Sequence, residues 1–185
     1  MRKRCPLLAV LLTIAACGNV PQEAAVEQPS NTGLRYLGGS AESGFARATQ
    51  PREFVFPADH ASHPDYRSEW WYFTGNLATA AGRHFGFELT FFRFAAAPPS
   101  PGSEGASAWR TEQIWMAHLA VTDSAGRRFF ARERLSREAL DLAGATAAPL
   151  RVWVQDWSAV GEQRDDMLAF RLEAHDEPVG LSLDV

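Results

Sequence analysis

Residues 69–78 read Glu69-Trp70-Trp71-Tyr72-Phe73-Thr74-Gly75-Asn76-Leu77-Ala78 and place four aromatic side chains in succession. A polar loop precedes this segment, and a glycine-containing turn follows it at 79–83. Aromatic enrichment between two turn-forming stretches is typical of a β-strand. Because residues 83–94 continue with the same aromatic character, we expect them to return as a second strand and to form a hairpin with the first.

The rest of the sequence repeats this pattern of short apolar segments separated by turns. Residues 98–102 are rich in proline, which lacks the backbone donor that a central strand needs, so we expect a loop there. We expect a helical turn at 136–142 and turns at 124–127, Gly161 and Glu177-Pro178. About seven strands at this spacing predict an all-β fold, either an antiparallel barrel or a sandwich. The five further strands are expected at 114–123, 128–135, 150–158, 167–175 and 179–185.

The two faces of the predicted strands differ along the chain. In the segment 167–175 apolar and charged side chains alternate, which predicts one buried face and one hydrated face. The first strand is apolar on both faces, with Trp71 and Phe73 on one side and Trp70 and Tyr72 on the other. We therefore expect a second layer outside this part of the sheet, formed by a ligand, a partner or a further domain.

The N-terminus has the layout of a secretory signal. Met1-Arg2-Lys3-Arg4 is cationic, and an uncharged apolar stretch follows over 7–16. This stretch is too short to span a bilayer, which takes about 20 apolar residues. It ends with Ala15-Ala16 before Cys17, an arrangement that resembles the lipobox of bacterial lipoproteins. We expect residues 1–16 to be a cleaved signal peptide, and Cys17 to be lipidated and to anchor the protein to a membrane.

Residues 17–50 are expected to be a flexible tether that follows the lipidated cysteine, because small and polar residues dominate them. One β domain then occupies residues 51–185. The other cysteine, Cys5, falls in the signal, so the mature domain has no thiol for a nucleophile or for a cysteine-based zinc site. An aspartate directly after the cysteine would resemble an inner-membrane retention signal, but residue 18 of this sequence is a glycine. We therefore expect an exported lipoprotein that faces the periplasm from the outer membrane.

The charge of the chain bears on its partners. The net charge is −4, and the arginines are scattered among acidic residues and form no basic face. This distribution argues against nucleic-acid binding.

Several motifs resemble one known family. The segment from Phe56-Pro57 through the first strand is similar to the opening motif of the carotenoid 1,2-hydratase and AttH-type lipocalin-like family, also described as predicted secreted hydrolases. Residues 85–93, Met116-Ala117-His118 and 154–158 add to this resemblance. The Glu-Trp-Trp-Tyr sequence at 69–72 is specific because tryptophan pairs are rare.

The resemblance implies a protein of two consecutive lipocalin-like barrels, of which this chain would hold the first. The sequence ends at Val185 within a strand pattern, and we expect it to be the N-terminal portion of a longer protein with a second barrel. The implied chemistry is cofactor-free hydration of an isoprenoid double bond. A carboxylic acid protonates the alkene, tryptophan faces stabilise the carbocation, and water traps it. The motifs that carry the chemistry in the hydratases have no match here, so no catalytic residue is transferred.

Three residues are weak candidates for catalysis. Glu69 and Glu88 flank aromatic residues, and a carboxylic acid in an apolar pocket stays protonated near neutral pH. Glu69 is better suited to an ion pair with an arginine, either Arg67 or Arg93, than to a role as an acid. His118 lies within an apolar strand, where a histidine is more often held by a neighbouring carboxylate than used as a base.

Ligand-binding and metal-binding residues can also be suggested. The tryptophans are most simply core residues, and Trp70, Trp71 and Tyr72 are candidates to line a cavity. A polar loop before the first strand has the residue types for a metal site, but an irregular loop fixes no ligand geometry. The simpler interpretation is a hydrogen-bonded loop, and we expect neither a metal nor a cofactor. The alternative metal ligands are Asp59, His60, His63 and Asp65.

Two classes of function remain open. One is a hydratase or hydrolase that acts on a hydrophobic isoprenoid or lipid-like substrate and is completed by a second barrel. The other is a non-catalytic lipoprotein that binds or carries an apolar ligand in a barrel cavity. A purely structural role in an assembly is a third alternative. The sequence leaves open whether this chain is an enzyme.

Overall fold

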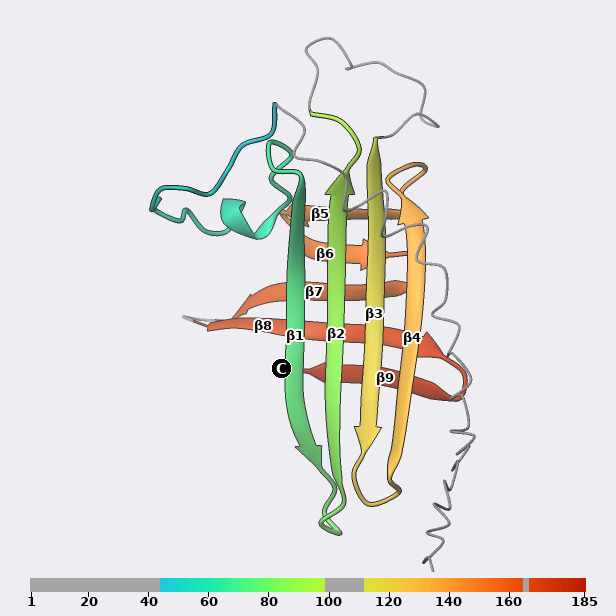
Figure 1. Cartoon of the computed structure of the whole chain (residues 1–185). Coiled ribbons are helices and arrows are strands. Elements are labelled where there is room, and N and C mark those ends of the chain that lie inside the picture. The colour runs from blue at the N-terminus through green and yellow to red at the C-terminus, as the bar shows by residue number, and fades with distance from the viewer. Residues whose placement is uncertain (1–43, 99–111, 165–166) are drawn as a thin grey trace, which may run out of the picture. The chain divides into compact units, whose positions relative to one another are not determined.

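The computed structural model describes residues 44–98, 112–164 and 167–185. In these ranges the first four strands form one antiparallel sheet, which we call sheet A, and the last five form a second, sheet B. Within each sheet every strand pairs with the next along the chain (Figure 1). The elements are η1 (Ala58–His60), β1 (Ser68–Ala78), β2 (His84–Ala95), β3 (Gln113–Asp123), β4 (Arg128–Arg137), β5 (Ala143–Ala147), β6 (Leu150–Val154), β7 (Trp157–Arg164), β8 (Met167–Asp176) and β9 (Val179–Asp184).

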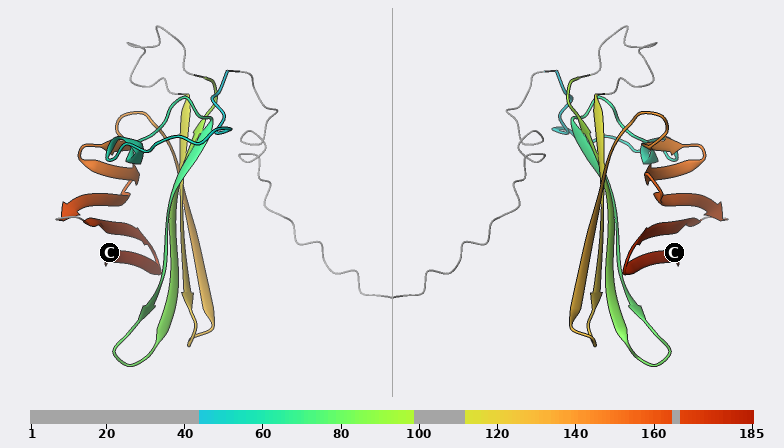
Figure 2. Two further views of the ribbon diagram at one scale, coloured as in Figure 1. Left: turned by 90° about the vertical axis from the view of Figure 1, so that its left-hand side faces the viewer. Right: turned by 90° about the vertical axis from the view of Figure 1, so that its right-hand side faces the viewer.

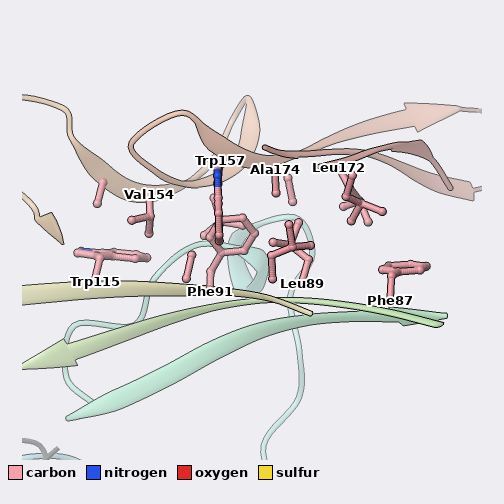
Figure 3. Close-up of a cluster of buried hydrophobic side chains, with 14 residues drawn as sticks. Phe87, Leu89, Phe91, Trp115, Val154, Trp157, Leu172 and Ala174 are labelled. Carbon is pink, nitrogen blue, oxygen red and sulfur yellow. The ribbon is translucent and has the colours of Figure 1, made fainter. Parts of the chain in front are cut away.

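The hydrophobic core lies between the two sheets, which face each other as separate layers in Figure 2. Aromatic and branched side chains at alternate positions of β2 and β3 pack against those of β6, β7 and β8 (Figure 3). This alternation follows from the two-residue period of a strand. The larger core residues with no exposed surface are Leu89, Phe91, Trp115, Leu119, Val154, Trp157 and Leu172.

Arginine side chains close the core at the β4 edge. Arg132 donates to the carbonyl of Glu177 at 2.8 Å, and Arg134 donates to the carbonyl of His175 at 3.1 Å. The guanidinium of Arg134 also lies 5.1 Å from the ring centroid of Trp157, so it covers the indole as a cation–π contact. The inward positions of β4 therefore link sheet A to the last hairpin of sheet B.

The all-β, antiparallel, lipocalin-like prediction is confirmed, and the described part has the two sheets of a sandwich. The expected single strand at 150–158 is wrong, because β6 and β7 are separated by a turn in which Gln155 has a φ of 58°. The expected turn at Gly161 is also wrong, since Gly161 lies within β7. A Cβ atom at that position would lie 2.4 Å from Leu150, so the glycine permits a close side-chain approach.

The segment 136–142 contains no helical turn. Instead β4 continues to Arg137, and the chain then bends through Leu140 and Asp141, which have φ values of 55° and 58°. Strand β5 follows at once and was not anticipated. These differences raise the expected seven strands to nine in the described residues.

Some predictions concern residues that the structure does not describe. The signal peptide at 1–16, the lipidated Cys17, the tether up to residue 43 and the proline-rich loop from residue 99 lie outside the described ranges. Within those ranges no helix has the length and apolar character needed to cross a membrane.

Candidate functional site

Strand alternation divides the candidate residues of β1 and β2 between two faces of sheet A. Trp71 packs against the core, whereas its neighbours Trp70 and Tyr72 are 64% and 54% exposed. The same parity places Glu69 on the core side and Glu88 on the opposite side, as the strand register requires. We call the side that points away from sheet B the outer face.

Two adjacent rows of side chains on the outer face differ in polarity. In the first row, Trp70 pairs with Phe92, Phe92 with Met116, and Met116 with Leu135. Leu135 is 58% exposed, whereas Met116 is buried beneath its neighbours. The first row is therefore an apolar band across all four strands. The second row lies two residues from the first on every strand. It consists of Tyr72, Thr90, His118 and Glu133.

The second row, together with Glu88 from the next row, supplies a polar cluster beside the apolar band. The His118 Nε2 atom lies 3.0 Å from Glu133 Oε2, and the ring of Phe92 meets the imidazole edge-on at a centroid distance of 5.2 Å. Thr90 donates from Oγ1 to Glu88 Oε1 at 3.1 Å. Because Glu88 pairs with Ala120 and Thr90 with His118, Glu88 and His118 occupy diagonal positions on neighbouring strands.

Glu69 has a structural role. Its Oε2 atom accepts from Arg93 Nη2 at 2.8 Å and from the His63 backbone N–H at 2.7 Å. The buried Arg93 side chain also donates to the carbonyl of His63 at 2.8 Å and to that of Tyr66 at 2.7 Å. Of the two arginines proposed as its partner, the structure pairs Glu69 with Arg93. This ion pair attaches the loop before β1 to sheet A. The Glu69 carboxylate is therefore engaged in hydrogen bonds within the protein.

Trp71 is likewise a structural residue. Its indole stacks on that of Trp115 at a centroid distance of 5.5 Å, and its Nε1 atom donates to the carbonyl of His60 at 2.9 Å. Trp71 thus supports the loop from the inner side. Among the three suggested ligand-binding residues, only Trp70 and Tyr72 are presented on the outer face.

The polar loop is held by its own hydrogen bonds. Asp59 accepts hydrogen bonds from the Val55 backbone and from Arg52, and its Oδ1 atom lies 2.9 Å from His63 Nε2. These contacts, the backbone N–H first, hold the pKa of Asp59 well below its usual range. His60 stacks on Phe56 at 4.4 Å, and Asp65 is exposed. No group of three His, Cys, Asp or Glu residues in the described ranges is arranged to hold a metal ion.

An apolar pocket of about 610 Å³ lies at the β4 edge of sheet A. Ile114 and Leu135 contribute to it from the outer face, and Leu140 and Leu142 contribute from the segment after β4. Its polar lining residues are Ser136, Arg137 and Gln155. The Gln155 amide bonds within the protein, accepting from Arg134 at 3.0 Å and donating to the Leu135 carbonyl at 3.1 Å. The pocket therefore continues the apolar band of the outer face.

Sequence reasoning did not identify Glu133, Leu135 or the pocket. The alternation of Phe129, Ala131, Glu133 and Leu135 on one side of β4 was a usable signal, because it marks a mixed face rather than a hydrated one. The position of Glu133 opposite His118 depends on the register between β3 and β4, which the alternation alone does not fix.

Comparisons with known proteins agree with the sequence resemblance. Residues 47–185 match the profile of the AttH-like family. A crystal structure from Nitrosomonas europaea, of a protein assigned as an AttH, aligns with a TM-score of 0.59 and 31% sequence identity. The alignment covers 76% of this chain and 39% of that one, so this chain spans well under half of the solved relative. No curated protein matches the sequence.

Proposed function

The chain belongs to the AttH-like family, and from this premise we propose that it is an envelope lipoprotein that binds a hydrophobic, isoprenoid or lipid-like molecule on the outer face of sheet A. The observation that carries the proposal is the apolar band beside the polar cluster. Trp70, Tyr72 and Leu135 are each more than half exposed. Contiguous exposed apolar surface with a polar rim is characteristic of ligand or partner sites.

The core between the sheets is a less suitable place for a ligand. Leu89, Phe91, Trp115, Trp157 and Leu172 fill it, and none of them has exposed surface. An interior packed at this density leaves no room for a large molecule without displacing core side chains, which is costly. We therefore place the ligand of a carrier on the outer face and not in a barrel cavity.

A second domain would complete the site. The solved relative extends far beyond the part that aligns with this chain. We propose that a second barrel of the same protein covers the outer face, so that the ligand lies between the two barrels. Lipidation at Cys17 would hold this assembly at the outer membrane, where apolar molecules partition.

A binding experiment tests the proposal directly. The full-length protein is titrated with a fluorescent polyene alcohol, and the Trp70→Ala and Leu135→Ala variants are compared with wild type. Truncation of a large apolar contact is expected to weaken binding about tenfold or more. Met167→Ala is the control, because Met167 is 72% exposed on sheet B. Equal affinities for wild type, Trp70→Ala and Met167→Ala would contradict the assignment of the outer face.

Hydration of an isoprenoid is a second candidate function, favoured by the position of Glu88 and His118 on one aromatic face. Hydration would require the acid form of Glu88, which would give its proton to one alkene carbon, while the aromatic rings would stabilise the carbocation on the other. Water would add to that carbon and lose a proton to His118. His118 would release this proton to solvent, and solvent would supply one to Glu88, so both groups would regain their starting states. The Glu88→Gln variant is expected to abolish alcohol formation while it retains binding. Undiminished turnover in this variant would exclude Glu88 as the acid.

A further inference from the structure

We infer that the outer face and the β4-edge pocket form one linear site for an uncharged long-chain alcohol, with the hydrocarbon tail in the pocket and the hydroxyl at the polar cluster. This inference rests on the proposed function and adds the orientation, length and charge of the ligand. It starts from the shared residues Ile114 and Leu135, which belong to the outer face and also line the pocket.

The pocket suits a hydrocarbon tail. Ile114, Leu135, Leu140 and Leu142 supply branched apolar walls, Ser136 and Arg137 line the rest of the edge, and the volume of about 610 Å³ lies within the range of small-molecule sites. Leu140 and Leu142 are 52% and 46% exposed, so they can be covered by a ligand. Gln155 satisfies both ends of its amide within the protein. An apolar group would therefore bury these walls without breaking those hydrogen bonds.

The strand register sets the length of the site. Ile114 lies at the pocket, and Ala120, six residues further along β3, pairs with Glu88. At about 3.4 Å per residue, the pocket and the row of Glu88 are roughly 20 Å apart. Phe92 and Met116 lie between these two points in the apolar band. A molecule that fills the site from Ile114 to the row of Glu88 is therefore a long chain rather than a compact ring.

The polar cluster determines the charge of the ligand's head group. It contains two carboxylates, Glu88 and Glu133, and one imidazole, His118. A carboxylate or phosphate placed here would meet like charge, which disfavours a fatty acid or a phospholipid. A hydroxyl can donate to either carboxylate at no such cost. The cluster thus selects a neutral alcohol at this end of the site.

Photo-crosslinking on the full-length protein tests the orientation. Two probes are used, both twenty-carbon isoprenoid alcohols, one with a diazirine at the tail and the other with a diazirine next to the hydroxyl. Mass spectrometry of the labelled peptides locates each reactive group. The tail probe is expected to label residues 135–142, and the head probe is expected to label the centres of β2 and β3. Labelling of the same residues by both probes would overturn the inferred orientation.

A pocket-filling variant tests the length. Leu140→Trp occupies the pocket and is expected to weaken binding of the twenty-carbon alcohol about tenfold, because several methylene groups lose their apolar contact. A ten-carbon alcohol is expected to bind the variant as it binds wild type. Met167→Trp on sheet B is the matched control. An equal loss for both alcohols would overturn the inference while leaving the proposed function intact.

Two further outcomes complete the test. A twenty-carbon fatty acid is expected to bind more weakly than the alcohol, and equal affinity would overturn the assignment of the head group. If neither alcohol binds wild type and neither probe labels the outer face, the proposed function itself fails. That result differs from an inverted or length-independent binding mode, in which the outer face is still labelled.

Discussion

At the scale of single residues, strand parity separates two carboxylates that look alike in the sequence. Glu69 and Glu88 both flank aromatic residues in paired strands. Glu69 points to the core side, where Arg93 and the His63 backbone occupy its oxygens. Glu88 points to the outer face, where Thr90 is its hydrogen-bond donor. One carboxylate is therefore part of the scaffold, and the other lies on the outer face, away from the core.

The first prediction concerns Arg93, which has an exposed fraction of 2%. Arg93→Met would leave Glu69 partly buried without its cation and would remove the donors to the carbonyls of His63 and Tyr66. Loss of one partner of a buried ion pair is strongly destabilising, so we expect the free energy of unfolding to fall by about 3 kcal/mol. Urea denaturation followed by tryptophan fluorescence measures this change.

The control for this prediction is Arg171→Met. Arg171 pairs with Asp184 at 2.8 Å, but both side chains are more than half exposed. Exposed ion pairs contribute little to stability because water solvates both charges. If the two methionine variants unfold at the same urea concentration, the Arg93 cluster does not anchor the loop.

The sequence was sufficient to assign some of these residues and not others. Alternation around Trp70-Trp71-Tyr72 predicted two apolar faces, which the structure shows. The choice of Arg93 over Arg67 as the partner of Glu69 depends on which residue of β2 lies opposite, and register is a tertiary property. For the same reason, Glu133 could not be assigned to His118 from sequence.

At the scale of elements, the long strands were predictable, and the short ones were not. Strand β5 is Ala-Gly-Ala-Thr-Ala, and alanine and glycine are depleted in strands, so no propensity marks it. The turn between β6 and β7 contains Gln155 in the left-handed region, where glycine or asparagine would have been a clear signal. Its conformation is supported instead by hydrogen bonds of its side chain to Arg134 and Leu135.

The second prediction concerns the turn between β3 and β4. The N–H of Gly126 donates to Asp123 at 2.9 Å, and a Cβ atom on Gly126 would lie 2.2 Å from Asp123 Oδ2. Gly126→Ala therefore displaces the carboxylate that binds Arg83 from the neighbouring hairpin turn and Arg128 from β4. We expect the melting temperature to fall by roughly 3–6 °C. Circular dichroism during heating measures this change.

Gly86→Ala is the matched control for this substitution. Gly86 lies in β2, and a Cβ atom there would meet Thr122 and Asn76 at 3.8 and 3.9 Å, which is ordinary contact. The variant is expected to melt close to wild type. A fall in melting temperature that is equal for both alanine variants would show that contact with Asp123 is not the cause.

At the scale of the whole described domain, the two sheets make unequal use of their faces. Sheet B has one buried face, and exposed residues such as Arg171, Glu173 and His175 lie on the other. Sheet A is apolar on the core side and again along the band of Trp70 and Leu135. Because the core is already filled, this second apolar surface adds nothing to the packing of the two sheets. We propose that a ligand or a second barrel covers this surface.

The last prediction concerns the acid stability of the domain. Hydrogen bonds, from Arg83 first and then from the Gly126 backbone, hold the pKa of Asp123 well below its usual range. The pKa of Asp59 and that of Asp184 are lowered in the same way, chiefly by the Val55 N–H and by Arg171, respectively. A carboxyl whose pKa is lower in the folded state stabilises the fold fully above its unfolded pKa, about 4.

As the pH falls below about 4, the unfolded chain takes up protons that the folded chain does not, so the free energy of unfolding must decrease. Urea denaturation between pH 7 and pH 3 measures this decrease. Asp123→Asn removes one of the three carboxyls, so it is expected to be less stable than wild type at pH 7 and to lose stability less steeply in acid. Equal slopes for the two proteins would show that Asp123 does not contribute to the acid transition.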